Sequence, residues 1–226
     1  MSRTIEQVAL LVGKDLRIEA RSRQTLGLVG VLGILIVVVL GLGLGAQQQG
    51  GMGLSATAVL WTAYLFSGVL CFEKTMAVER GDAALAGLMM APLDRGVIFV
   101  AKLVSNLALM ACVTTVVTAA GVLFFSFDLS AAPGQFVLVM GVGMVGFAAI
   151  GTLFSAVVSS SRLQGGLLAL VVFPLALPLV IASTQLLLRI FRDGESAGGQ
   201  ALAVIVAFDL IFLVTSWVLF EWVLEP

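Results

Sequence analysis

Six long apolar stretches, separated by short polar connections, make up most of this 226-residue chain. A helix rises ~1.5 Å per residue, so about 20 apolar residues cross a hydrocarbon core of ~30 Å, and each stretch is long enough for that. The pattern therefore predicts an all-α integral membrane protein whose six transmembrane helices occupy residues 25–226. The stretches begin near Leu26, Gly53, Leu103, Gln135, Gly166 and Gln200.

The polar segment that precedes the first stretch, residues 1–24, has a helical repeat of apolar positions. Most of its basic residues fall elsewhere on the helical wheel. This pattern predicts an amphipathic helix that either lies flat on the membrane surface or acts as a basic anchor that fixes the topology. The segment mixes acidic with basic residues and lacks a compact apolar core, so we do not expect a cleaved signal peptide. The apolar positions are Ile5, Val8, Val12 and Leu16.

The basic residues are unevenly distributed among the connections. They cluster in residues 1–24 and 73–102, and Arg162 lies between the fourth and fifth stretches, whereas residues 46–52 and 128–134 contain no Lys or Arg. Because positively charged connections stay in the cytoplasm, we expect both termini to be cytoplasmic. The exceptions on the outer side are Arg189 and Arg192, which Asp193 and Glu195 partly offset.

Composition excludes several classes of function. Hydrophobic residues make up 60% of the chain and charged residues 11%, which is unlike a soluble domain. The chain has no histidine, the commonest metal ligand, and Cys71 and Cys112 have no paired spacing, so we expect inert membrane thiols. The Gly13-Lys14 pair lacks the other residues of a phosphate-binding loop. We therefore expect a chain that is not itself an enzyme and binds no metal, nucleotide or nucleic acid.

Three kinds of residue stand out inside the predicted helices. Pro174 and Pro178 each remove a backbone donor, so the fifth helix should bend there, either as a moving hinge or as a static kink. Asp209 is an acidic residue deep within the last stretch; it either lines a dimer or subunit interface or is a protonated or hydrogen-bonded structural carboxyl. Glycines predict close contacts between helices. They are Gly27, Gly30, Gly33, Gly141, Gly143, Gly146 and Gly151.

The connection at residues 73–96 is the longest charged interruption between two stretches. The second helix can continue through Glu79 and Arg80 before the chain turns. Asp82 is then a good N-cap and Pro92 ends the short helix that follows. Since a connection has no core of its own, the apolar face of this helix must lie on the membrane or enter a groove on a partner. That face consists of Leu85, Leu88 and Met89.

Several motifs between residues 72 and 183 resemble a known family. They are Phe72-Glu73, Glu79-Arg80-Gly81, Ala84-Leu85, Leu88, Ala91-Pro92-Leu93, Ala101-Lys102, Ser159-Ser160-Ser161-Arg162, Gly165-Gly166-Leu167-Leu168 and the paired prolines within Val172 to Leu179. The pattern is similar to that of exporter-type ABC permeases, and most of all to CcmB, the haem exporter family of cytochrome c maturation permeases. Outside this region the first and last stretches match the family only in hydropathy.

The resemblance implies a permease subunit in the bacterial inner membrane that forms a homodimer and recruits a separate ABC ATPase, CcmA-like, on which ATP is bound. It also implies haem-handling membrane subunits, CcmC-like and CcmD-like, and a CcmE-like haem chaperone. Haem would be handled by this complex rather than bound by the chain alone. Whether the permease moves haem or uses ATP to release the loaded chaperone stays open. The residues that would couple to the ATPase are Glu79, Arg80, Asp82, Leu85, Leu88, Met89 and Pro92.

Two other functions remain as alternatives. An ion-coupled secondary transporter would have inverted repeats and intramembrane ion sites, but the two three-span halves show no convincing repeat. A membrane assembly scaffold without transport activity is the other alternative. A membrane enzyme would need a cluster of reactive polar residues, which the sequence lacks.

Overall fold

Every regular element in the residues that the computed structural model describes is an α-helix. These residues are 2–22, 24–44, 54–81, 94–125, 127–160 and 166–223. All the helices except the first are long and apolar enough to cross a membrane, which confirms the prediction of an all-α protein with six spans. The helices are α1 (Ser2–Ser22), α2 (Gln24–Gly43), α3 (Leu54–Gly81), α5 (Arg95–Phe125), α6 (Pro133–Ser160), α7 (Leu167–Asp193) and α8 (Gly199–Val223).

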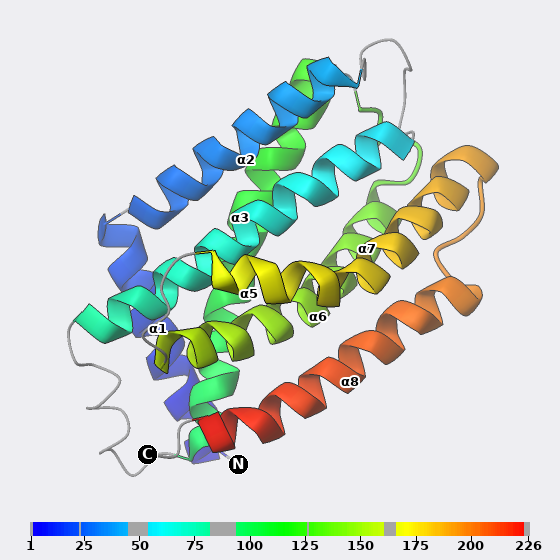
Figure 1. Cartoon of the computed structure of the whole chain (residues 1–226). Helices are drawn as coiled ribbons and strands as arrows, with labels where there is room; N and C mark the ends of the chain where they lie inside the picture. The colour runs from blue at the N-terminus through cyan, green and yellow to red at the C-terminus, as the bar shows by residue number, and fades with distance from the viewer. Residues whose placement is uncertain are drawn as a thin grey trace.

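The six spans run alternately in opposite directions, and α6 occupies the centre of the bundle (Figure 1). It packs against α3, α5, α7 and α8, while α2 packs against α3 and α5. The N-terminal helix α1 packs mainly against α5. We call the end of the bundle where α1 lies the α1 end and the opposite one the far end. Because successive spans alternate, α3, α6 and α8 finish at the α1 end and α5 and α7 begin there.

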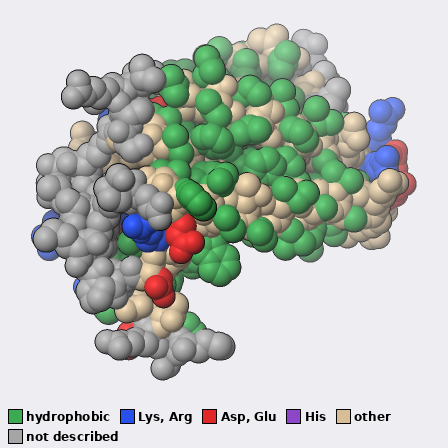
Figure 2. Space-filling view, turned by 60° about the horizontal axis from the view of Figure 1, so that its bottom comes forward, with side chains coloured by type: hydrophobic (Ala, Val, Ile, Leu, Met, Phe, Trp, Pro, Cys, Tyr) green, Lys and Arg blue, Asp and Glu red, His purple; other side chains and the backbone are tan. Residues whose placement is uncertain are grey.

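The sides of the bundle carry the apolar surface that a lipid bilayer requires. In Figure 2, apolar side chains cover the middle of the molecule, and the charged side chains gather at its two ends. Large apolar residues such as Leu123 on α5 and Trp222 on α8 are exposed, at 79% and 70%. Inside, aromatic and small residues fill the space between the helices. Such close packing holds the bundle together, because in lipid no hydrophobic force drives helices toward one another.

Helices α3 and α6 are joined by a reciprocal pair of aromatic and glycine contacts. A Cβ atom added at Gly68 of α3 would meet the ring of Phe147, and one added at Gly151 of α6 would meet the ring of Phe72. The two rings also lie against each other, with centroids 5.4 Å apart. Each helix therefore inserts an aromatic side chain into a space that a glycine leaves on the other.

The glycine prediction is confirmed at some positions and wrong at others. At the confirmed positions an added Cβ would contact a neighbouring helix, whereas at the others no atom lies within 4 Å of it. The small side chain is therefore needed only on the helix faces that meet a partner. The confirmed positions are Gly33, Gly143, Gly146 and Gly151, and the wrong ones are Gly27 and Gly141, which are exposed. Gly30 is buried, but an added Cβ there would meet no atom within 4 Å.

Helix α5 begins at Arg95, well before the predicted start of the third span near Leu103. The prediction was wrong because two basic residues that interrupt the apolar pattern have partners in the folded chain. The Arg95 guanidinium donates to the backbone carbonyl of Glu221 at 3.0 Å, and the Lys102 ammonium pairs with Asp15 at 2.8 Å. A charged group with a partner can lie within a helix that continues into the membrane.

Candidate functional site

The residues predicted to couple to an ATPase lie at or beyond the end of α3. Glu79 and Arg80 belong to the last turn of α3, which ends at Gly81. The chain resumes at Asp94, directly before α5. The predicted coupling segment therefore connects α3 with α5 at the α1 end of the bundle. Its other predicted residues, Asp82, Leu85, Leu88, Met89 and Pro92, lie outside the residues that the structure describes.

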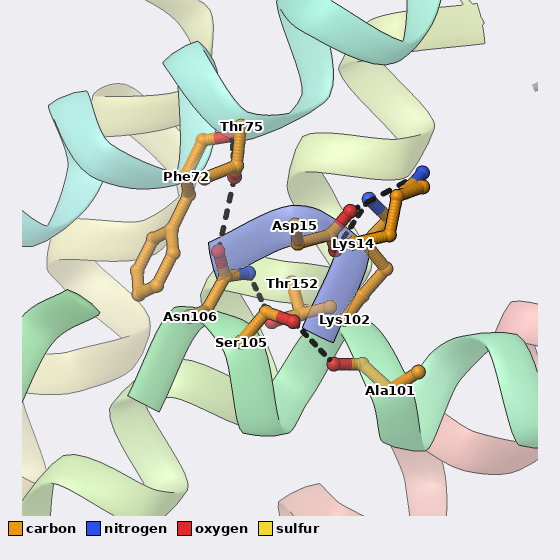
Figure 3. A network of polar contacts seen from close by, with 9 residues as sticks. All are labelled: Lys14, Asp15, Phe72, Thr75, Ala101, Lys102, Ser105, Asn106 and Thr152. Carbon is orange, nitrogen blue, oxygen red and sulfur yellow. Dashed lines mark hydrogen bonds and ion pairs between the residues drawn. The ribbon is translucent and has the colours of Figure 1, made fainter. Parts of the chain in front are cut away.

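A buried chain of hydrogen bonds joins α3, α5 and α6 near the point where α3 leaves the bundle. The Thr75 hydroxyl, one helical turn before Glu79, lies 3.0 Å from the Asn106 Oδ1, to which it donates. The Asn106 Nδ2 donates in turn to the Thr152 hydroxyl at 2.9 Å. Asn106 is 1% exposed and Thr152 is fully buried. Figure 3 shows the three side chains in line between their helices.

An ion pair joins α1 to α5 at Lys102, one turn before Asn106 on α5. The Lys102 Nζ lies 2.8 Å from the Asp15 Oδ2, and both side chains are largely buried. Lys14 contacts the other oxygen of the same carboxylate at 3.2 Å (Figure 3). The Glu19 carboxylate accepts the backbone N–H of Leu26 at 2.8 Å, which ties α1 to the start of α2. Because a buried charge is costly without a partner, these contacts fix the position of α1.

Asp15 and Glu19 of α1 therefore face the bundle, which the sequence did not indicate, whereas the basic residues Arg17 and Arg21 are exposed. Ile5 and Leu10 are 65% and 69% exposed, while Leu16 packs against the core. Part of the apolar surface is thus left on the outside of the bundle, where a membrane surface could cover it. The sequence predicted the helix correctly but gave no sign that Asp15 has a partner on α5.

Together these contacts form what we call the α1-end network, defined as Asp15, Thr75, Lys102, Asn106 and Thr152. It connects α1, α3, α5 and α6 immediately inside the segment that joins α3 to α5. A displacement of the α1 end of α3 would act directly on Asn106 and, through it, on α6. The arrangement can transmit movement between helices.

Asp209 lies inside the chain, on the face of α8 that meets α6. It is 5% exposed, and a Cβ atom added at Gly146 would meet its Oδ1. That oxygen has no hydrogen-bond partner among the described residues. The glycine at position 146 thus leaves the space that the carboxyl occupies. The side chain faces α6 of its own chain rather than the outside of the bundle.

The prolines of α7 lie within a continuous helix. α7 runs from Leu167 to Asp193 through Pro174 and Pro178, both of which are exposed on its outer face. Figure 1 shows α7 changing direction partway along its length. Ala176, between the two prolines, is buried against the core. Proline rings on the outside leave the inner face free to pack, and the hinge stays a prediction.

The described residues contain no group of three or more His, Cys, Asp or Glu side chains that could hold a metal ion. Cys71 is buried and Cys112 is exposed on the outside of α5, and neither forms a disulfide.

The CcmB family model, described as CcmB protein, matches residues 6–220 of this chain. The match covers nearly all of α1 and every span, including the first and last, which in the sequence resembled the family only in hydropathy. No curated protein matches the chain.

Proposed function

Because this chain belongs to the CcmB family, a membrane component of the cytochrome c maturation ABC system, we propose that it transmits ATP-driven motion from a partner ATPase to its transmembrane helices. In this proposal a CcmA-like ATPase binds at the α1 end, and that end faces the cytoplasm of a bacterial inner membrane. The motion then drives haem delivery at the far end or release of the haem-loaded chaperone.

One observation carries the proposal: the α1-end network lies directly inside the segment that joins α3 to α5. A partner that moves this segment would pull on Thr75 through α3 and on Lys102 through α5. Asn106 connects both helices to Thr152 of α6, the helix at the centre of the bundle. A displacement of the segment between α3 and α5 would therefore reach α6, which packs against α3, α5, α7 and α8.

We further propose that haem is held by partner subunits, CcmC-like and CcmD-like, and by a CcmE-like chaperone. The chain contains no histidine, and histidine is a common axial ligand of haem iron. Haem is then a substrate of the complex. A homodimer of this chain would supply two α1 ends, one for each ATPase domain.

Replacing Leu85 and Leu88 with Asp tests the docking step. If both leucines enter a groove on the ATPase, each contributes ~1.5–3 kcal/mol of apolar burial, so the ATPase should no longer co-purify with the permease. The matched control replaces both leucines with Met, which keeps the apolar surface and should keep the ATPase bound. Full co-purification and cytochrome c maturation in the Asp variant would refute the docking and favour a membrane-lying helix.

A further inference from the structure

A groove of about 560 Å³ lies at the α1 end of the bundle, where α1, α5 and α8 meet. Its apolar lining includes Ile5 of α1 and Val100 of α5, together with the indole of Trp217 on α8. Two carboxylates, Asp94 and Glu221, also line it. The volume falls in the range of sites that hold a small molecule.

Contacts between α5 and α8 hold the wall of this groove in place. The indole nitrogen of Trp217 lies against Gly96, where an added Cβ would collide with it. The rings of Phe99 and Phe220 contact each other at a tilt of 52°, with centroids 5.2 Å apart, and the Arg95 guanidinium donates to the carbonyl of Glu221. The groove is therefore formed before any ligand arrives.

The polarity of the groove changes over a short distance along both helices. At ~1.5 Å per residue, the path along α5 from Asp94 to Val100 is ~9 Å, and that along α8 from Glu221 to Trp217 is ~6 Å. The interfacial layer between lipid head groups and hydrocarbon is about 5–8 Å deep on each side of a bilayer. The change from carboxylate to apolar lining therefore matches the change from head group to acyl chain.

We propose that this groove binds a phospholipid whose head group carries a primary amine, such as phosphatidylethanolamine. The ammonium group would donate to the carboxylates of Asp94 and Glu221, which form no ion pair with a described residue, and the upper acyl chain would lie along Val97 and Val100. A quaternary choline group has no N–H to donate, and an anionic head group would be repelled by both carboxylates.

Fluorescence quenching by brominated lipids tests the proposal with the full-length chain. A Trp222→Phe variant in phosphatidylcholine vesicles leaves Trp217 in the groove and Trp61, which is buried. A minor fraction of lipid brominated on its acyl chain is added, with either an ethanolamine or a choline head group. At equal mole fraction we expect the ethanolamine lipid to quench the Trp217 fluorescence about twofold to fivefold more than the choline lipid. This ratio corresponds to the preference in binding that an exposed ion pair supplies.

The carboxylates are then removed in the same background. Asp94→Asn with Glu221→Gln should bring the two lipids to equal quenching, while the Arg95 contact to the backbone of residue 221 is kept. The matched control, Asp193→Asn with Glu195→Gln, changes two exposed carboxylates at the far end and should keep the preference. The proposal would be overturned if both lipids quenched the parent chain equally, or if an anionic brominated lipid quenched it more strongly. It would also be overturned if the groove variant kept the preference for the ethanolamine lipid or if the control variant lost it.

Discussion

Replacing Asn106 with Leu removes the centre of the α1-end network while filling the same volume with an apolar side chain. The substitution deletes the 3.0 Å bond from Thr75 and the 2.9 Å bond to Thr152. Hydrogen bonds between helices in membranes contribute ~0.6 kcal/mol on average and up to ~1.7 kcal/mol, so two of them give a loss of about 1–3 kcal/mol. This is a modest loss, and we expect the chain to insert and fold.

The consequence for function should be larger than that for stability. If the network transmits motion, the Asn106→Leu complex should retain its ATPase and hydrolyse ATP, yet support less cytochrome c maturation per ATP hydrolysed. The measurements are the free energy of unfolding of the purified chain in mixed micelles, ATP hydrolysis by the purified complex, and the amount of matured cytochrome c in cells.

Thr115→Val is the matched control on the same helix. The Thr115 hydroxyl is exposed and donates only within α5, to the carbonyl of Ala111 at 2.7 Å. Thr152→Val removes a single bond of the network and should cost about half as much as Asn106→Leu, and the double variant should be non-additive because both changes act on one bond. If Asn106→Leu matches Thr115→Val in stability and in maturation per ATP, the network carries no motion and the reasoning is refuted.

Two further predictions concern the intramembrane carboxyl and the topology. Gly146→Ala should destabilise the chain by ~1–3 kcal/mol, because its methyl group collides with the Asp209 carboxyl in a packed interior, and Asp209→Ala should relieve the loss when unfolding of the double variant is measured. Asp209→Asn keeps the shape and hydrogen bonding of the side chain without its charge, so normal cytochrome c maturation in this variant would exclude an ionic role. Failed maturation with intact assembly would make Asp209 a working residue, and Asp209→Leu would then show whether polarity alone is sufficient. In a cysteine-free background, single cysteines at Gln48 and Ser130 should react with an impermeant reagent from outside the cell and one at Ser160 should not; the reverse pattern would contradict the orientation.

The number and placement of the spans could be read from the sequence because both depend on local properties. A long run of apolar residues is sufficient to predict a membrane helix, whatever the helix packs against. The exception was the start of α5, where Arg95 and Lys102 interrupt the run. Lys102 pairs with Asp15 and Arg95 donates to the backbone carbonyl of Glu221. Both partners are far away in the sequence and have no local signal.

The α1-end network could not be predicted for the same reason. Thr75, Asn106 and Thr152 come from three different helices, and no spacing along the chain relates them. One signal was available: a polar amide or an ammonium group inside a predicted span is costly unless it has a partner. Applied to Asn106 and Lys102, that rule would have indicated buried contacts, although not which residues supply them.

The reciprocal contacts between α3 and α6 limit how these helices can differ among related chains. A larger residue at Gly68 is tolerated only if Phe147 becomes smaller, and the same holds for Gly151 and Phe72. The four positions should therefore change in matched pairs during evolution, each glycine together with the ring that it admits. The two rings also prevent α3 from sliding past α6, because a shift of one turn would drive each ring into a neighbouring side chain. When the complex works, α3 and α6 should therefore keep their register, so that any relative movement of the two helices is a tilt or a bend at their ends rather than a slide along their axes.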